Sequence, residues 1–167
     1  ALAFTRPSPA RLYKLVMRKP ETIRWGLAGT GTIAHRFAAD IGHADGAVLA
    51  AVCSRELGKA QSFAAKHPGV TAFGSLAELI SSEAVDAVYL ATPNMAHRAQ
   101  ALACIAAGMP VMAEKPLAAD LAEAMDIKAA AEAANVFVME ALWSRYLPAV
   151  KAARAALRDG VIGKVRR

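Results

Sequence analysis

From residue 22 onward, short apolar runs alternate with longer segments in which apolar residues recur at helical spacing. The short runs predict β-strands, and the segments between them predict helices. The predicted strands are Ile23–Ala28, Ala47–Cys53, Thr71–Phe73 (the weakest), Ala87–Leu90, Val111–Ala113 and Val136–Met139. The predicted helices cover residues 32–42, 56–66, 75–82, 95–107 and 119–134. Strands that alternate with helices in this way predict an α/β fold with a doubly wound parallel sheet in a three-layer αβα arrangement.

Local sequence signals agree with these boundaries. Ser75 and Glu78 have the spacing of a capping box at the start of the third predicted helix. Gly108 follows the fourth helix, where a glycine C-cap is typical, and Asp120 lies in the first turn of the fifth helix, where the helix dipole favours an acid. A single α/β domain is therefore predicted over residues 22–145.

The excess positive charge of the chain lies at its two ends. The first 20 residues carry five basic side chains, no acidic one and three prolines, and the last four residues carry three more basic side chains. Without those eight charges, the rest of the chain has 12 basic and 14 acidic side chains. Because a nucleic-acid-binding surface normally belongs to the folded domain, no nucleic-acid partner is expected. Residues 1–21 are predicted to be a flexible leader.

Hydropathy and cysteine content narrow the class further. The chain is 56% hydrophobic and 20% charged, as expected for a globular domain. No apolar run approaches the roughly 20 residues of a membrane-spanning helix, so no membrane partner is expected. Cys53 and Cys104 are too few and too isolated for a disulfide framework or a metal site, and two buried thiols in a reducing compartment are the simpler interpretation. A cytoplasmic protein without a metal site is predicted.

A glycine-rich turn follows the first predicted strand and opens the first helix. Its residues are Gly29, Thr30, Gly31, Thr32, Ile33 and Ala34. This is the G-x-G-x-x-A form of the dinucleotide fingerprint, in which the first glycine makes the tight turn and the second lets the backbone approach a pyrophosphate. The alanine allows the helix to pack closely on the strand, and the helix N-terminus offers free N–H groups to phosphate. The alternative is a tight turn without a ligand.

The residues after the second strand bear on the choice of cofactor. Enzymes that prefer NAD usually carry an acid there, which holds the ribose 2′-hydroxyl. Here Ser54 and Arg55 occupy the position, and a hydroxyl with a guanidinium suits a 2′-phosphate. NADP is therefore predicted over NAD. In the alternative interpretation, Arg55 is solvated and Ser54 caps the next helix.

Further polar residues follow the strand Ala87–Leu90. In a doubly wound sheet, ligands bind beyond the carboxyl ends of the strands, so this loop is expected to line the same crevice. Its candidate residues are Thr92, Pro93, Asn94 and His97. The alternative makes Asn94 a helix cap and His97 an exposed residue in the first helical turn, and for His97 the two interpretations stay open.

The strand Val111–Ala113 ends abruptly in Glu114, Lys115 and Pro116. The proline biases Lys115 toward an extended backbone. Beside an oxidised nicotinamide, the positive ring would lower the pKa of the lysine and suit it to proton exchange with a substrate hydroxyl or carbonyl. Glu114 is a candidate to orient it. The alternative is a solvated Glu-Lys pair on a loop.

Four segments in order carry a resemblance to a known family. They are GLAGTGTIA, VDAVYLATPNMAH, GMPVMAEKPLA and VFVMEALWSRYLPAV. Over residues 22–167 the chain resembles the amino-terminal half of the Gfo/Idh/MocA oxidoreductases, nearest to their NADP-dependent dihydrodiol and D-xylose dehydrogenases. The resemblance implies a Rossmann-type NAD(P)-binding domain with Lys115 and His97 as catalytic candidates. It also implies that the loop of Thr92, Pro93, Asn94 and His97 lines the nicotinamide side, and that Trp143 and Arg145 reach back to the cofactor. Without the resemblance, Trp143 and Tyr146 would be interpreted as core aromatic residues.

The resemblance also implies a function and a missing part. It implies hydride transfer to or from a hydroxyl or carbonyl group of a sugar, polyol or trans-dihydrodiol, with a possible homo-oligomer. Family members carry a carboxyl-terminal α/β domain, which is largely absent here, and residues 146–167 are expected to form a helix and the start of that domain. The alternative function is a non-catalytic nucleotide-binding or regulatory module on the same scaffold.

Overall fold

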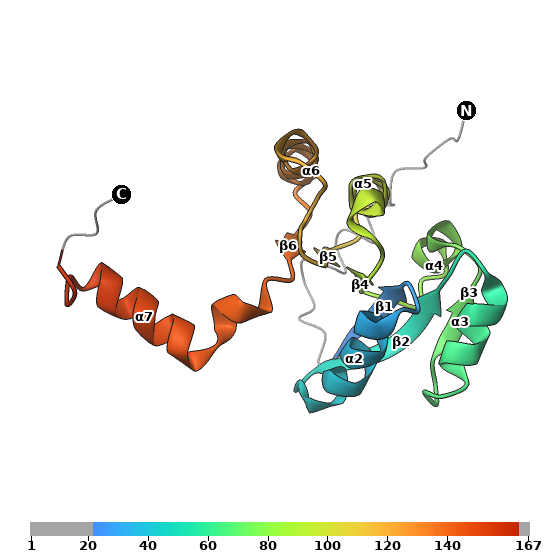
Figure 1. Ribbon diagram of the computed structural model, residues 1–167. Helices are drawn as coiled ribbons and strands as arrows, with labels where there is room; N and C mark the ends of the chain where they lie inside the picture. The colour runs from blue at the N-terminus through green and yellow to red at the C-terminus, as the bar shows by residue number, and fades with distance from the viewer. Residues whose placement is uncertain (1–21, 164–167) are drawn as a thin grey trace.

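A computed structural model describes residues 22–163 as a six-stranded parallel sheet with helices on both faces (Figure 1). The strands are β1 (Ile23–Ala28), β2 (Ala47–Cys53), β3 (Thr71–Phe73), β4 (Ala87–Leu90), β5 (Val111–Ala113) and β6 (Val138–Glu140). The α-helices are α2 (Thr32–Asp40), α3 (Leu57–Ala64), α4 (Leu76–Ser81), α5 (His97–Ala106), α6 (Leu121–Ala134) and α7 (Pro148–Arg158). Short 3₁₀ turns are η1 (Ile41–His43), η2 (Asn94–Ala96) and η3 (Trp143–Tyr146). The predicted α/β fold is confirmed.

Two apolar clusters give the molecule its three layers. One cluster joins α2 and α3 to the sheet and includes Ala34, Phe63, Val52 and Leu27. The other joins α4, α5 and α6 to the opposite face and includes the fully buried residues Leu79, Cys104, Ile127 and Val88. Because strands between two helical layers bury both of their faces, they are apolar throughout rather than alternating, as the sequence has them.

The strand order is β3-β2-β1-β4-β5-β6, and every neighbouring pair is parallel. The chain order therefore reverses between β1 and β4, which is the topological switch point of a doubly wound sheet. At the carboxyl edge, Ala28 of β1 pairs with Cys53 of β2 and with Leu90 of β4. Leu90 in turn pairs with Ala113 of β5, and Ala113 with Glu140 of β6. The residues that follow these strands consequently emerge along one edge.

The capping signals act as the sequence indicates. The Ser75 hydroxyl accepts the Glu78 N–H at 3.1 Å, and the Glu78 carboxylate accepts the Gly74 N–H at 3.0 Å. Asp120 caps α6 by accepting the Glu123 N–H at 2.9 Å. The bonds to the Glu78 and Glu123 N–H groups satisfy donors that the first turn of a helix leaves without intrahelical partners, and the bond to Gly74 fixes the residue before the N-cap of α4.

The last strand differs from its prediction, because β6 runs Val138–Glu140 instead of Val136–Met139. Asn135 ends α6 in the left-handed conformation (φ 51°), and the Val136 N–H then bonds the Ala131 carbonyl at 3.0 Å. Val136 is thus still part of the helix terminus, since C-terminal carbonyls take such partners. The helix predicted over 95–107 likewise begins later, at His97, because η2 precedes it.

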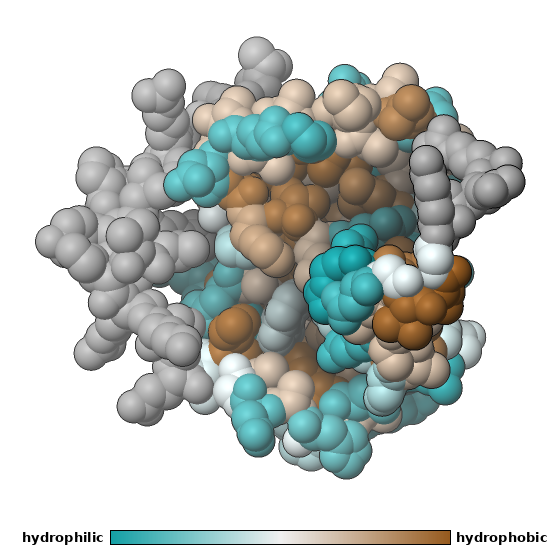
Figure 2. All heavy atoms as spheres, turned by 90° about the vertical axis from the view of Figure 1, so that its left-hand side faces the viewer, coloured by the Kyte–Doolittle hydropathy of each residue, from teal (hydrophilic) through white to brown (hydrophobic). Residues whose placement is uncertain are grey.

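The segment after β6 leaves the sheet. Helix α7 lies apart from the other helices in Figure 1, and its main contacts are with η3. Figure 2 shows the side of the molecule that carries α7, where apolar side chains gather on the surface. Within residues 22–163, no helix has both the length and the apolar character needed to cross a membrane. The predicted leader lies outside the described residues, and the proposed domain boundaries stay predictions.

Candidate nucleotide-binding site

The turn between β1 and α2 is packed tightly against the end of β4. Gly29 has a φ of +105°, a region that side chains rarely adopt. A Cβ placed there would lie 2.8 Å from the Ala91 carbonyl oxygen, and the Gly29 N–H donates to the Cys53 carbonyl at 2.9 Å. The glycine therefore joins the ends of three strands, and no other residue fits without moving backbone.

Gly31, by contrast, borders open space. It is the N-cap of α2, and a Cβ placed on it would meet no atom within 4 Å. No side chain caps this helix, so its first N–H groups keep no side-chain partner. Ala34, one turn further, is fully buried against the sheet. This arrangement fits a pyrophosphate, because the backbone can be approached at Gly31 and the helix dipole favours an anion there.

Ser54 and Arg55 follow β2 at the same edge. The Ser54 hydroxyl accepts the Glu56 N–H at 3.3 Å, whereas the N-cap of α3 is Glu56, without a side-chain cap bond. The alternative in which Ser54 caps the helix is therefore wrong. Arg55 is exposed, and it has no ion pair within residues 22–163.

A cavity of about 430 Å³ opens between the glycine loop and α3. Thr30, Glu56, Lys59 and Lys66 are among its lining residues, and the Lys59 ammonium pairs with the Glu56 carboxylate at 2.7 Å. The sequence interpretation missed Lys59. Its position four residues after Arg55, in the first turn of the following helix, is the signal that was available.

The loop after β4 contributes three predicted residues. The half-buried Thr92 donates its hydroxyl proton to the Gln100 side chain at 2.5 Å, and Pro93 is exposed. The Asn94 oxygen accepts the adjacent Met95 N–H at 3.0 Å, and no side chain caps η2 or α5. The alternative of Asn94 as a helix cap is therefore wrong.

His97 is the least exposed predicted site residue of this loop, at 1%. Its Nε2 lies 2.8 Å from the Thr92 carbonyl oxygen, and its Nδ1 lies 3.0 Å from the Pro116 carbonyl oxygen. The alternative of an exposed first-turn residue is wrong, since the ring is buried between two loops. Both ring nitrogens have backbone partners, so the contacts support a positioning role, and a catalytic role stays a prediction.

Glu114 and Lys115 diverge sharply in exposure where the chain leaves β5. Glu114 is 9% exposed, whereas Lys115 is exposed and is joined to Pro116 by a cis peptide bond. The Tyr89 hydroxyl donates to one carboxylate oxygen of Glu114, and the Lys115 backbone N–H donates to the other at 3.0 Å. The alternative of a solvated pair is therefore wrong for Glu114. Sequence interpretation missed Tyr89, because a tyrosine within an apolar strand gives no signal beyond core packing.

Trp143 and Arg145 lie in η3, shortly after β6. Trp143 is 64% exposed and Tyr146 is 54% exposed, so their interpretation as core aromatic residues is wrong. The Ala141 N–H bonds the Ala113 carbonyl at 2.7 Å, which places the start of this segment beside the end of β5. The predicted contact of Trp143 and Arg145 with a cofactor stays a prediction.

The two cysteines are free and buried, as the sequence indicates. Burial is the main cause that raises the pKa of both the Cys53 and Cys104 thiols to about 12. Because the thiolate is the reactive form, neither is suited to act as a nucleophile. No group of three or more potential metal ligands occurs among residues 22–163.

Comparison with known proteins agrees with this geometry. Residues 23–142 match the family described as "Oxidoreductase family, NAD-binding Rossmann fold". The mouse (Mus musculus) trans-1,2-dihydrobenzene-1,2-diol dehydrogenase is 38% identical over 146 residues, which are 86% of this chain and 44% of the relative, and the human enzyme is 36% identical with the same coverage. The chain thus spans less than half the length of these curated relatives.

Two solved structures show the same fold. An NAD-binding oxidoreductase from Klebsiella pneumoniae matches with a TM-score of 0.78 at 31% identity, over 85% of this chain and 40% of that one. KijD10, a 3-ketoreductase from Actinomadura kijaniata solved with TDP-benzene and NADP, matches with a TM-score of 0.77 at 29% identity, over 87% and 46%. With its glycine loop at the switch point of a parallel sheet, the chain belongs to the Gfo/Idh/MocA family of oxidoreductases, in its NAD-binding Rossmann domain.

Proposed function

We propose that this chain is the nucleotide-binding part of an NADP-dependent oxidoreductase that acts on a hydroxyl or carbonyl group of a sugar, polyol or trans-dihydrodiol. The observation that carries the proposal is the register of the sheet. It aligns the carboxyl ends of β1, β2, β4 and β5, so that the glycine loop, Arg55, Thr92 and Lys115 follow along one edge. A dinucleotide extends along such an edge across the switch point.

The phosphates are assigned to the β1–α2 turn and to the end of β2. Gly31 and the N–H groups of the first turn of α2 would hold the pyrophosphate. The Ser54 hydroxyl and the Arg55 guanidinium would hold the 2′-phosphate, and the Lys59 ammonium lies close enough in sequence to join them. Glu56 already pairs with Lys59, so it would compete with the 2′-phosphate for that cation.

The chemistry is assigned to the end of β5. NADP, when bound, supplies or accepts the hydride. Lys115 would exchange a proton with the substrate oxygen as the carbinol and carbonyl forms interconvert, and its exposed side chain beside a fixed backbone suits that role. The names of the dihydrodiol dehydrogenases and of the ketoreductase support a reaction that interconverts an alcohol and a carbonyl group.

Calorimetric titration tests the cofactor assignment. We expect NADPH to bind at least about tenfold more tightly than NADH, because charge-assisted bonds to the 2′-phosphate add to the shared contacts. Arg55→Ala should weaken NADPH binding about tenfold while NADH binding changes less than about twofold. Arg158→Ala, on α7, is the matched control and should change neither. Tighter binding of NADH by the wild-type chain would contradict the NADP assignment.

Turnover is tested separately, by NADPH consumption with a panel of sugars and diketones. Consumption above the rate without substrate would support the oxidoreductase. Binding of NADPH without any turnover would instead support either a nucleotide-binding or regulatory module, or a nucleotide-binding part that is not active alone.

A further inference from the structure

Tyr89 and Glu114 form a buried polar pair behind the predicted catalytic lysine. Tyr89 lies on β4 with 4% exposure, and its ring stacks on Phe37 of α2 with centroids 4.2 Å apart. Its hydroxyl donates to a carboxylate oxygen of Glu114, which follows the neighbouring strand β5. The Glu114 N–H bonds the Leu90 carbonyl at 2.9 Å, so the residue is held by both its backbone and its side chain.

The carboxylate needs this partner because it is buried. A buried charge is costly unless hydrogen bonds replace its hydration. Glu114 has two such donors, the Tyr89 hydroxyl on one oxygen and the Lys115 backbone N–H at 3.0 Å on the other. Burial, followed by the bond to Glu114, raises the pKa of Tyr89, which keeps its hydroxyl protonated and able to donate.

The backbone on the other side of Lys115 is anchored as well. The Pro116 carbonyl lies 3.0 Å from Nδ1 of His97, and the Leu117 N–H donates to the Glu140 carboxylate at 3.0 Å. Side chains of β4, α5 and β6 thus converge on one loop, whereas the Lys115 side chain is exposed to solvent. A fixed backbone beneath an exposed reactive side chain is what preorganisation of a catalytic group requires.

We propose that Tyr89 is a positioning residue for Lys115, acting through Glu114: its hydroxyl fixes the carboxylate that holds the Lys115 N–H. The inference rests on the proposed function, because Lys115 has a reacting partner only if the cofactor binds at this edge. Tyr89 itself need not touch cofactor or substrate. Loss of the Tyr89 hydroxyl is therefore expected to change the position of Lys115 more than the affinity of the protein for NADPH.

The test is Tyr89→Phe in the 167-residue chain, with Tyr146→Phe as the matched control. Tyr146 loses the same group, a hydroxyl directed at the Met139 sulfur at 3.7 Å. By NMR, the Lys115 amide should exchange with deuterium about tenfold faster in Tyr89→Phe, because its acceptor is no longer anchored. The control should exchange at the wild-type rate. Thermal unfolding, measured in parallel, distinguishes this local effect from loss of the fold.

A second measurement follows the side-chain carbon resonance of Lys115 as NADP⁺ is added. The positively charged nicotinamide ring of NADP⁺, when close to the Lys115 ammonium, perturbs that resonance. The resonance should therefore shift clearly in the wild-type chain and in the Tyr146→Phe control. Tyr89→Phe should still bind NADP⁺ yet lose about half of that shift or more, a change that a merely structural role of Tyr89 would not produce.

Substitutions of Glu114 keep the test decisive if Tyr89→Phe fails to fold. Glu114→Gln retains an oxygen for the Lys115 N–H and a polar group facing Tyr89, so exchange at Lys115 should stay within about threefold of wild type. Glu114→Ala removes both of these polar groups, so the Lys115 amide should exchange about tenfold faster than in wild type. An unchanged Lys115 exchange rate or an intact NADP⁺-induced shift in folded Tyr89→Phe overturns the inference. If the wild-type chain does not bind NADP⁺, the proposed function fails, whereas the exchange rates still decide whether Tyr89 holds Lys115.

Discussion

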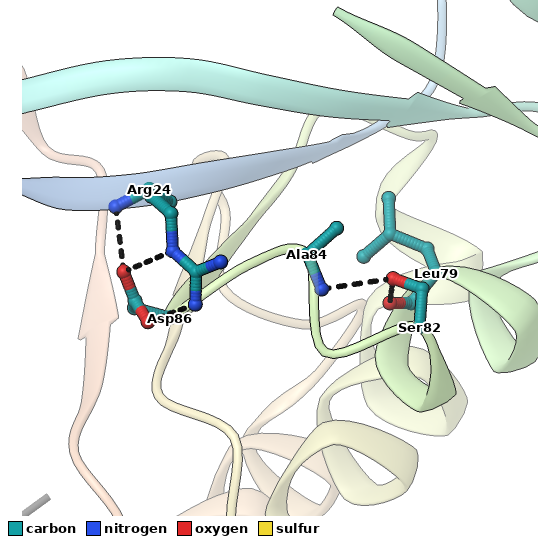
Figure 3. A network of polar contacts seen from close by, with 5 residues as sticks. All are labelled: Arg24, Leu79, Ser82, Ala84 and Asp86. Atoms are coloured by element: carbon teal, nitrogen blue, oxygen red, sulfur yellow. Dashed lines mark hydrogen bonds and ion pairs between the residues drawn. The ribbon is translucent and has the colours of Figure 1, made fainter.

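The two edges of the sheet use charge in different ways. At the amino edge, Arg24 of β1 and Asp86, which precedes β4, bond each other: Nη2 and Nε of the guanidinium lie 2.8 and 3.0 Å from the two carboxylate oxygens (Figure 3). Each backbone also contributes one bond, from the Arg24 N–H to the carboxylate at 2.9 Å and from the Asp86 N–H to the Arg24 carbonyl at 2.8 Å. In the turn after α4, which lies near this edge, the Ser82 hydroxyl donates to the Leu79 carbonyl and accepts the Ala84 N–H.

At the carboxyl edge, Lys59 pairs with Glu56, but two other cations of the candidate site are not paired. Arg55 and Lys115 have no ion pair within the described part of the chain, and the one buried carboxylate, Glu114, holds a backbone N–H. A partly exposed ion pair stabilises the fold modestly, whereas an exposed cation without an ion pair is available to an anionic ligand. The amino edge thus contributes to stability, whereas the proposed function assigns binding and chemistry to the carboxyl edge.

The largest effect is expected for Lys115→Ala, tested on a form of the protein that turns over NADPH. Turnover should fall at least about 100-fold, as is typical when a general acid or base is removed. NADPH affinity should change less than about twofold, because the pyrophosphate and 2′-phosphate contacts remain. Lys128→Ala is the control, since Lys128 pairs with Glu132 on α6. Unchanged turnover would remove Lys115 from the mechanism.

The two glycines of the loop should separate stability from binding. Gly31→Val fills the open space at the α2 N-terminus, so NADPH affinity should fall about 30-fold while the free energy of unfolding changes by less than about 1 kcal/mol. Gly29→Ala forces a side chain into φ +105° against a backbone oxygen, and should lower the free energy of unfolding by about 2 kcal/mol. Calorimetry and denaturant unfolding measure the two effects, and full NADPH affinity in a folded Gly31→Val protein would contradict the phosphate assignment.

The smallest effect is expected at the amino edge, for Asp86→Asn. The partners are 46% and 33% exposed, so solvent screens the pair and the free energy of unfolding should fall by only about 0.5–1 kcal/mol. Burial opposes ionisation of Asp86, but the bonds and charge of Arg24 outweigh it and lower the pKa of the carboxyl group. The stabilisation is therefore present at neutral pH and is lost as the pH falls through that lowered pKa.

Thermal unfolding at several pH values tests this sign. The melting temperatures of wild type and Asp86→Asn should differ by a few degrees at pH 7 and converge below about pH 4. NADPH affinity should be the same in both proteins, since Asp86 lies at the opposite edge from the glycine loop. A difference that grows as the pH falls would contradict the role assigned to Arg24.

The sequence predicted the local structure best where its signals come from neighbouring residues. The glycine loop directly follows β1, and the capping residues Ser75 and Asp120 each accept an N–H from three residues further along the chain. His97 and Tyr89 could not be interpreted in the same way. The His97 ring bonds a carbonyl 19 residues distant, and the Tyr89 hydroxyl bonds a carboxylate 25 residues distant. A histidine in a first helical turn and a tyrosine in an apolar strand are each compatible with several environments.

The periodicity of apolar residues by itself determined the α/β class and the positions of the strands, because burial of a strand or helix face is set by residues a few positions apart. The sequence also determined where the glycine loop lies, since Gly29 is required by its own backbone conformation. Only the tertiary structure decided which polar groups meet. Strand order and register bring Tyr89, Glu114 and His97 to the loop of Lys115, and such contacts depend on the packing of segments distant in the chain.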